Sequence, residues 1–91
     1  MARPQFPNKH YTVIIADRAQ KNLGKLPQKV ASKVVFKLDL LSGDLFQGTK
    51  LAGELSGLFS LRVWPYRIIY RVDDKKKRVE VVDIGHRQGI Y

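Results

Sequence analysis

The spacing of apolar residues divides the first half of the chain into one strand and two helices. The run 11–15 is short and rich in β-branched residues, which is typical of a strand. Ala16-Asp17 then offers the N-cap of a helix. Apolar residues follow in this helix at helical spacing: Ala19, Leu23 and Leu26. Gly24 weakens the helix, and Pro27 ends it or opens the next one at its first position.

A second helix is predicted from Gln28 to Leu41. Its apolar residues are three and four positions apart and form one stripe: Val30, Ala31, Val34, Val35, Leu38 and Leu41. The segment 42–44 closes this helix, and 45–56 is expected to be a loop region that contains glycine.

The second half of the chain predicts three strands, at 58–63, 66–72 and 79–85. Trp64-Pro65 joins the first two, and the polar segment 73–78 forms the hairpin tip between the last two. No helix intervenes between these strands, so they are expected to form an antiparallel meander. The predicted fold class is α+β: an N-terminal strand, a helical hairpin, then an antiparallel β-meander with the helices packed on one sheet face.

Length and composition indicate a single domain over residues 1–91, with 1–9 as a flexible or extended arm. Cysteine is absent from the 91 residues, which excludes disulfides and thiolate metal sites. The first ten residues lack the apolar region of a signal peptide, and no apolar run approaches the ~20 residues that cross a bilayer. We therefore expect a cytoplasmic protein with no membrane contact.

The charge is the first indication of function. Seventeen Lys and Arg face eight Asp and Glu, which gives a net charge of +9. Such an excess in a small domain favours a nucleic acid or ribosome as partner, although an acidic protein or a merely solvated cationic surface also fits. Lysines recur every four residues in the two helices: Lys21, Lys25, Lys29, Lys33 and Lys37. A stripe of this kind is usually a solvated face, and a direct role in RNA binding is the alternative.

Two arginines flank the connection between the first two strands of the meander. If Trp64-Pro65 is a tight connection, Arg62 lies opposite Arg67, with ~5 Å between their Cβ atoms. Like charges at that distance are unfavourable unless an anion sits between them. A longer loop would instead stagger the two and point each one into water.

The last residues carry further polar groups. His86 titrates near neutrality and could exchange a proton, Arg87 could hold a phosphate with two hydrogen bonds, and Tyr91 could stack on a base. A lone histidine is more often structural, which is the alternative for His86. We attach no role to His10.

Other chemistries find no support in the sequence. There is no glycine-rich phosphate loop, no paired-carboxylate pattern and no cluster of His, Asp and Glu at metal-ligand spacing, so we expect no cofactor and no metal. An enzyme of this kind would take its nucleophile from the substrate, and RNA supplies one in its 2′-hydroxyl.

Several of these segments together resemble the RelE/ParE toxin superfamily. They are Leu23–Pro27, Lys50–Gly53, Gly57–Val63, Tyr66–Tyr70, Ile84–Arg87 and the final Tyr91. The resemblance runs from Tyr11 to Tyr91, nearly the whole chain. It implies the toxin of a type II toxin–antitoxin pair, and the RelE-like branch is favoured.

The resemblance also implies roles for individual residues. RelE-like members cut mRNA in the ribosomal A site and leave a 2′,3′-cyclic phosphate. Arg67 matches the arginine that stabilises the phosphate, Arg87 matches a second catalytic arginine, and Tyr91 matches a tyrosine near the scissile nucleotide. We expect Arg67, Arg87, His86 and Tyr91 to be catalytic in a metal-free endoribonuclease. Residues expected to bind the RNA are Arg62, Lys50 and Arg71.

One departure from the family keeps a second function open. Some RelE enzymes carry two lysines on the strand before the turn, and the matching positions here are Leu58 and Ser60, neither of which can act as a base. Either His86 or Lys50 then accepts the proton, or catalysis is weak. ParE-like members inhibit DNA gyrase without cleaving RNA, which is the alternative function; a basic RNA-binding or ribosome-binding module without toxicity is a third.

The family also implies partners. These are mRNA and the ribosome, together with a cognate antitoxin that is acidic and partly disordered and folds around the basic surface. The expected assembly is a toxin–antitoxin hetero-oligomer.

Overall fold

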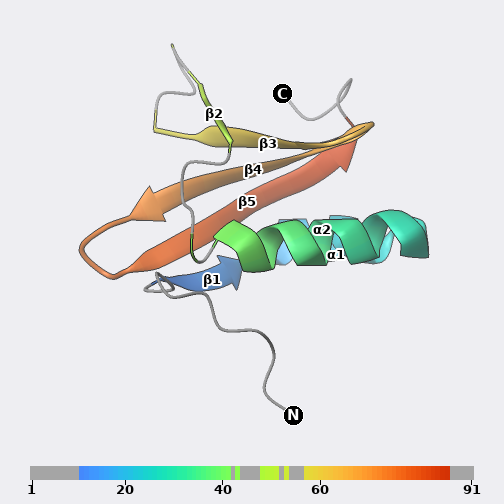
Figure 1. Cartoon of the computed structure of the whole chain (residues 1–91), viewed down its shortest axis with the longest axis horizontal. Coiled ribbons are helices and arrows are strands. Elements are labelled where there is room, and N and C mark those ends of the chain that lie inside the picture. Colours follow the sequence, from blue (N-terminus) through green and yellow to red (C-terminus); the bar gives the residue numbers. More distant parts are fainter. Residues whose placement is uncertain (1–10, 42, 44–47, 52, 54–56, 87–91) are drawn as a thin grey trace.

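Two helices cover one face of a five-stranded mixed sheet in the computed structural model, which describes residues 11–41, 43, 48–51, 53 and 57–86 (Figure 1). In chain order the elements are β1 (Thr12–Ile15), α1 (Asp17–Gly24), α2 (Gln28–Leu41), β2 (Thr49–Lys50), β3 (Phe59–Val63), β4 (Tyr66–Asp73) and β5 (Arg78–His86). The strand order across the sheet is β1-β5-β4-β3-β2. The predicted α+β class is confirmed.

The three late strands form the antiparallel meander that the sequence predicts, from β3 through β4 to β5. The first strand, β1, pairs in parallel with β5, with Thr12 opposite Arg78, and so forms one edge of the sheet. The other edge is β2, which pairs with β3 inside the segment expected to be a loop. That expectation was wrong because two residues are too few to produce a recognisable alternation.

The helices begin and end close to the predicted residues. Ala16 occupies the N-cap of α1 without a side-chain hydrogen bond, so the capping expected from Ala16-Asp17 is absent. Asp17 is instead the first residue of the helix, where its negative charge is favourable beside the positive end of the helix dipole. α2 begins directly after Pro27, whose carbonyl accepts a hydrogen bond from the backbone N–H of Ala31 at 2.9 Å.

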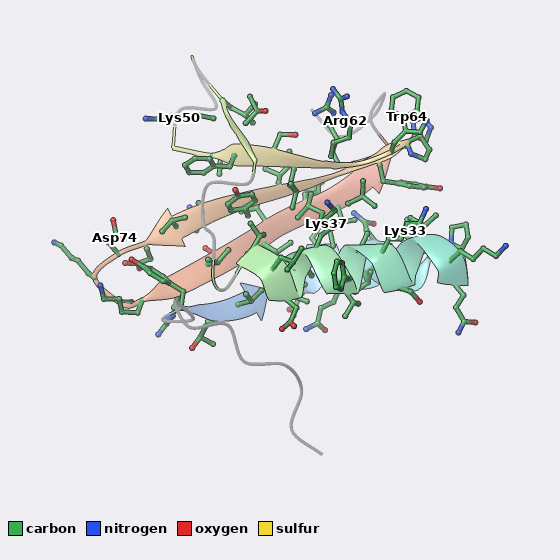
Figure 2. The ribbon with its side chains drawn as sticks, in the orientation of Figure 1. Lys33, Lys37, Lys50, Arg62, Trp64 and Asp74 are labelled. Carbon is green, nitrogen blue, oxygen red and sulfur yellow. The ribbon has the colours of Figure 1, made fainter. Side chains whose placement is uncertain are left out.

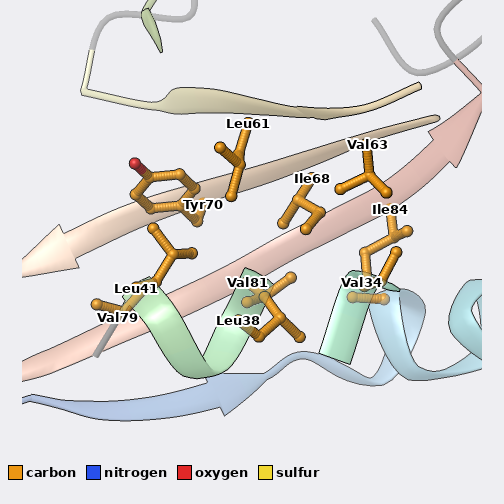
Figure 3. Packing of buried hydrophobic residues seen from close by; sticks show 11 residues of the cluster. Val34, Leu38, Leu41, Leu61, Val63, Ile68, Tyr70, Val79, Val81 and Ile84 are labelled. Carbon is orange, nitrogen blue, oxygen red and sulfur yellow. The ribbon is translucent and has the colours of Figure 1, made fainter. Parts of the chain in front are cut away.

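The core lies between the helices and one sheet face. Val34, Leu38 and Leu41 of α2 are nearly or fully buried, as is Ala19 of α1. Figure 3 shows the sheet residues that meet them: Leu61, Val63, Ile68, Tyr70, Val79, Val81 and Ile84. Val35, which the predicted apolar stripe included, is 54% exposed, because it lies one position beyond Val34 and turns about 100° away from the sheet.

An extra residue in β5 changes which side chains share a face. Tyr70 pairs with Val81 but the preceding Ile69 pairs with Asp83, so β5 contains a β-bulge at this point. Val79 and Val81 face the helices before the bulge, and Ile84 faces them after it. Asp83 is drawn toward α1, where its carboxylate accepts a hydrogen bond from the Asn22 side chain at 2.7 Å.

Candidate nucleic-acid interface

Arg62 and Arg67 lie directly opposite each other on the sheet face that points away from the helices. Val63 pairs with Tyr66 and closes the two-residue turn Trp64-Pro65, whose peptide bond is cis. The tight connection predicted from the sequence is therefore confirmed, and Arg62 faces Arg67 across β3 and β4. We call these two residues the arginine pair.

Arg67 is held in place by a neighbouring hydroxyl. Its guanidinium donates a hydrogen bond from Nη1 to Oγ of Ser60 at 3.1 Å. Ser60 is only 3% exposed, whereas Arg67 is half-buried and Arg62 is exposed. Ser60 is one of the two positions that the sequence resemblance matches to lysine, and its hydroxyl accepts this hydrogen bond from Arg67.

The surroundings of the arginine pair leave its charge available. Among the described residues, no carboxylate forms an ion pair with Arg62 or Arg67. On its other side Arg67 pairs with Gly85 of β5, which presents no side chain next to the guanidinium. Two neighbouring guanidinium groups are suited to an anion that can accept hydrogen bonds from both, such as a phosphodiester.

Arg71 lies on the same strand and the same face as Arg67, but its guanidinium is paired with a carboxylate. It lies opposite Glu80, and its Nε and Nη2 atoms each lie 2.6 Å from the same carboxylate oxygen. Both residues also line a hollow at the tip of the β4–β5 hairpin, away from the arginine pair. The RNA-binding role expected of Arg71 stays a prediction, and it would require Glu80 to release the guanidinium.

The structure does not bring His86 or Lys50 to the arginine pair. His86 lies opposite Tyr66, and their rings meet edge to face at 5.6 Å between centroids. Lys50 lies opposite Phe59, whose ring stacks on Tyr70 at 5.2 Å. Tyr66 and Phe59 lie on the sheet face that meets the helices, since they alternate along their strands with Arg67 and Ser60. Their cross-strand partners, His86 and Lys50, therefore lie on that face too, opposite to the face of the arginine pair. Their proposed roles remain untested predictions, which this placement does not favour.

Arg87 and Tyr91, the other two residues expected to be catalytic, lie outside the described residues. Their roles remain predictions that rest on the sequence resemblance.

The lysine stripe belongs to the other side of the molecule. Lys21, Lys25, Lys29 and Lys33 are exposed and Lys37 is half-buried; Lys25 is the C-cap of α1, and the other four lie in the helices. Figure 2 shows Lys33 and Lys37 on α2, while Arg62 projects from the far end of β3 on the side away from that helix. The stripe and the arginine pair are therefore separate basic surfaces.

One exposed aromatic residue at the arginine pair was missed in the sequence analysis. Trp64 lies at the tip of the β3–β4 turn and is 61% exposed. The signal was present in the two-residue connection itself, because a residue at such a tip has few neighbours to bury it.

Comparison with known proteins agrees with the fold. The model of the ParE toxin family of type II toxin–antitoxin systems matches residues 13–91. The chain is 37% identical over 86 residues to the toxin RelG of Mycobacterium tuberculosis, covering 89% of this chain and 95% of RelG. It is 36% identical over 83 residues to the toxin RelE of the same organism, covering 89% and 86%.

A solved structure gives the same result. The toxin–antitoxin complex RelBE2 of M. tuberculosis contains a chain that superposes with a TM-score of 0.79 at 37% identity, covering 85% of this chain and 98% of that one. The α+β fold, with two helices and a five-stranded sheet, is therefore shared with a toxin from such a complex. The chain belongs to the RelE/ParE superfamily of type II toxins, and its named relatives place it with the RelE-like branch.

Two kinds of feature are absent from the described residues: a helix that could span a membrane and a cluster of metal ligands. Neither helix within them has the length and apolar character needed to cross a membrane. The same residues contain no group of three or more His, Asp or Glu side chains placed to hold a metal ion.

Proposed function

We propose that the protein is an endoribonuclease that cleaves mRNA on the ribosome. The observation that carries this proposal is the arginine pair: two guanidinium groups directly opposite each other, one fixed by Ser60, with no carboxylate among the described residues to neutralise them. Two like charges opposite each other repel and destabilise a sheet. A phosphate bound between them would attract both guanidinium groups and offset this repulsion.

The reaction that suits this geometry is an internal transfer within RNA. The 2′-oxygen attacks the adjacent phosphorus, the bond to the 5′-oxygen breaks, and a 2′,3′-cyclic phosphate and a free 5′-hydroxyl result. One proton leaves the 2′-hydroxyl and one reaches the departing 5′-oxygen, each by general acid–base transfer. Negative charge grows on the non-bridging oxygens in between, where Arg62 and Arg67 would stabilise it.

The relatives support the same proposal. The curated proteins that align with most of the chain carry the names RelG and RelE. The sequence resemblance implies cleavage of mRNA in the ribosomal A site by RelE-like members. His86, Arg87 and Tyr91 remain the proposed further catalytic residues, with Arg87 and Tyr91 expected to complete the site that Arg67 begins.

The first test removes one guanidinium. We expect Arg67→Ala to lower cleavage by about 10²–10³-fold, the effect of removing one donor that stabilises transition-state charge. In-cell mapping of mRNA 5′ ends after toxin expression measures the cleavage. Lys75→Ala is the matched control, because it removes an exposed cation from the tip of the β4–β5 hairpin and should leave cleavage unchanged.

A conservative variant separates charge from geometry. Arg67→Lys keeps the charge but loses the planar fork that holds a phosphate with two hydrogen bonds, so most of the activity should still be lost. Full cleavage in Arg67→Ala, with the variant folded and expressed as the wild type, would remove the arginine pair from the mechanism.

Inhibition of DNA gyrase is the second candidate, because the family model that matches the chain is named for ParE toxins. It predicts blocked supercoiling by purified gyrase and intact mRNA in cells that express the protein. The same mRNA maps, read beside a supercoiling assay, separate the two functions.

An antitoxin is the proposed partner. The RelBE2 structure that resembles this chain is a toxin–antitoxin complex, and a net charge of +9 favours an acidic segment that folds on the toxin surface. The proposed assembly is a hetero-oligomer in the cytoplasm. A short reading frame for an acidic protein next to this one is the observation that would support it.

A further inference from the structure

Trp64 combines a large apolar surface with exposure beside the arginine pair. It is the only tryptophan in the chain, and 61% of its surface is open to solvent. A fully buried aromatic side chain removes on the order of 150–250 Å² from water, so an indole with this exposure leaves a large apolar area in contact with solvent. An aromatic face of this size next to two cations is more informative than a scattered exposed leucine.

The turn that carries Trp64 directly follows the strand that carries Arg62. Only Val63, the last residue of β3, separates the two residues in the chain. Figure 2 shows Arg62 and Trp64 projecting from the same end of the β3–β4 hairpin and toward the same side, away from α2. A phosphate held by the guanidinium groups would leave the base of the same or the next nucleotide within reach of the indole.

We propose that Trp64 is a stacking platform for an unpaired base of single-stranded RNA, next to the phosphate held by Arg62 and Arg67. This inference rests on the proposed function and deepens it by naming the substrate as unpaired RNA with a base beside the bound phosphate. Stacking on an aromatic ring tolerates any base and prefers purines, which offer the larger face. The platform therefore contributes affinity and positioning and does not take part in proton transfer.

The charge around Trp64 favours RNA over an apolar protein partner. Arg62 lies two positions before Trp64 and Arg67 three positions after it, and the two arginines pair across the strands that the turn joins. A partner without phosphates that docked on the indole would leave both cations next to an apolar contact. Docking of a protein on the same indole is a distinct outcome that the tests below separate.

The first experiment uses Trp64 as its own reporter, because it is the sole tryptophan. The purified toxin is titrated with a hexamer of 2′-O-methyl adenosine, which cannot be cleaved, and with a hexamer of the same phosphates lacking bases. Quenching of tryptophan fluorescence by the adenosine hexamer and little or none by the abasic one supports the platform. Equal quenching by both, or quenching by neither, overturns it.

The second experiment compares two aromatic residues of equal exposure. Trp64→Ala should weaken binding of the adenosine hexamer roughly 5- to 150-fold, which corresponds to the ~1–3 kcal/mol of one base stacked on an aromatic ring. Trp64→Phe should recover most of that loss. Phe36→Ala is the matched control: Phe36 is also 61% exposed but lies on α2, away from the arginine pair, and should bind as the wild type.

Failure of the platform and failure of the nuclease are distinguishable. If mRNA maps show cleavage but Trp64→Ala changes neither hexamer affinity nor the rate of cleavage, the platform is wrong and the nuclease stands. If no cleavage occurs while base-dependent quenching persists, the platform stands as an RNA-binding site. Weaker binding of the antitoxin to Trp64→Ala, with RNA binding unchanged, assigns the indole to a protein interface and overturns the proposal.

Discussion

At the scale of single residues, Gly48 determines how closely the chain before β2 can approach β3 and β4. The backbone N–H of Gly48 donates a hydrogen bond to the hydroxyl of Tyr70 at 3.1 Å, and Tyr70 is fully buried. A Cβ at position 48 would lie 2.8 Å from that hydroxyl and 2.9 Å from the carbonyl oxygen of Ser60. Gly48 therefore lets the chain before β2 approach β3 closely, and it contacts the residue that orients Arg67.

We predict that Gly48→Ala destabilises the protein by about 1–3 kcal/mol, since the carbonyl of Ser60 is fixed in the strand and cannot move aside. Gly24→Ala is the matched control. It has no atom within 4 Å of an added Cβ and ends a helix, so the protein should become more stable by a few tenths to about 1 kcal/mol. Urea denaturation measures both, and equal effects of the two changes would contradict this explanation.

At this scale the sequence predicts a residue's position where local backbone geometry alone determines it. The pairing of Arg62 with Arg67 followed from a two-residue connection, because such a turn fixes the register of its strands. The exposure of Val35 did not follow, since several rotations of α2 are compatible with its apolar residues and only contact with the sheet selects one.

At the scale of elements, the β-bulge in β5 determines which functional residues share a face. Without the extra residue, the register of the hairpin tip would continue, and His86 would lie on the same face as Arg67. The bulge shifts the pairing by one, so Gly85 lies opposite Arg67 and His86 lies opposite Tyr66. This parity does not follow from the sequence, because neither Val82 nor Asp83 carries a local signal for an inserted residue.

A second contact between elements links Tyr11, the residue directly before β1, to the β4–β5 hairpin. The Tyr11 hydroxyl donates a hydrogen bond to the Asp74 carboxylate, and Nζ of Lys77 lies 5.3 Å from the centre of the Tyr11 ring. The hydrogen bond to Asp74 raises the pKa of Tyr11 above its ordinary value of 10.0, with smaller contributions from desolvation and from the charge of Asp74.

This raised pKa predicts a loss of the contact at high pH. A folded-state pKa above the unfolded value means that the contact stabilises the fold fully below pH 10.0 and that this contribution disappears as pH rises through the folded pKa. We expect the difference between the absorbance titrations of wild type and Tyr11→Phe at 295 nm to show one tyrosine ionising later than a free tyrosine. Ionisation at or below the ordinary value would contradict the contact.

At the scale of the whole molecule, the excess charge is distributed over two separate surfaces. The lysines lie on the helices and the arginine pair lies on the opposite sheet face, so a net charge of +9 does not describe a single patch. Composition alone indicated a polyanionic partner but gave no position for it. The helical spacing and the strand register were both needed to separate the two surfaces.

We predict that the salt dependence of RNA binding locates the phosphate contacts at the arginine pair. Binding of single-stranded RNA should weaken with a slope of about −0.7 in log–log coordinates for each phosphate contacted, so Arg62→Ala or Arg67→Ala should each reduce the magnitude of the slope by about 0.7. Lys75→Ala, with its exposed charge at the hairpin tip, should leave the slope unchanged. Titrations of the adenosine hexamer at several salt concentrations measure the slopes, and identical slopes for all four proteins would place the phosphates elsewhere.

The parallel pairing of β1 with β5 has a consequence for synthesis of the protein. Thr12 is among the first residues of the fold to be made, yet its neighbour in the sheet is Arg78, and its backbone N–H bonds to the carbonyl of Lys77. β1 therefore cannot form its backbone hydrogen bonds in the sheet until β5 has left the ribosome. This topology delays completion of the sheet until β5, the last strand of the fold, has been synthesised.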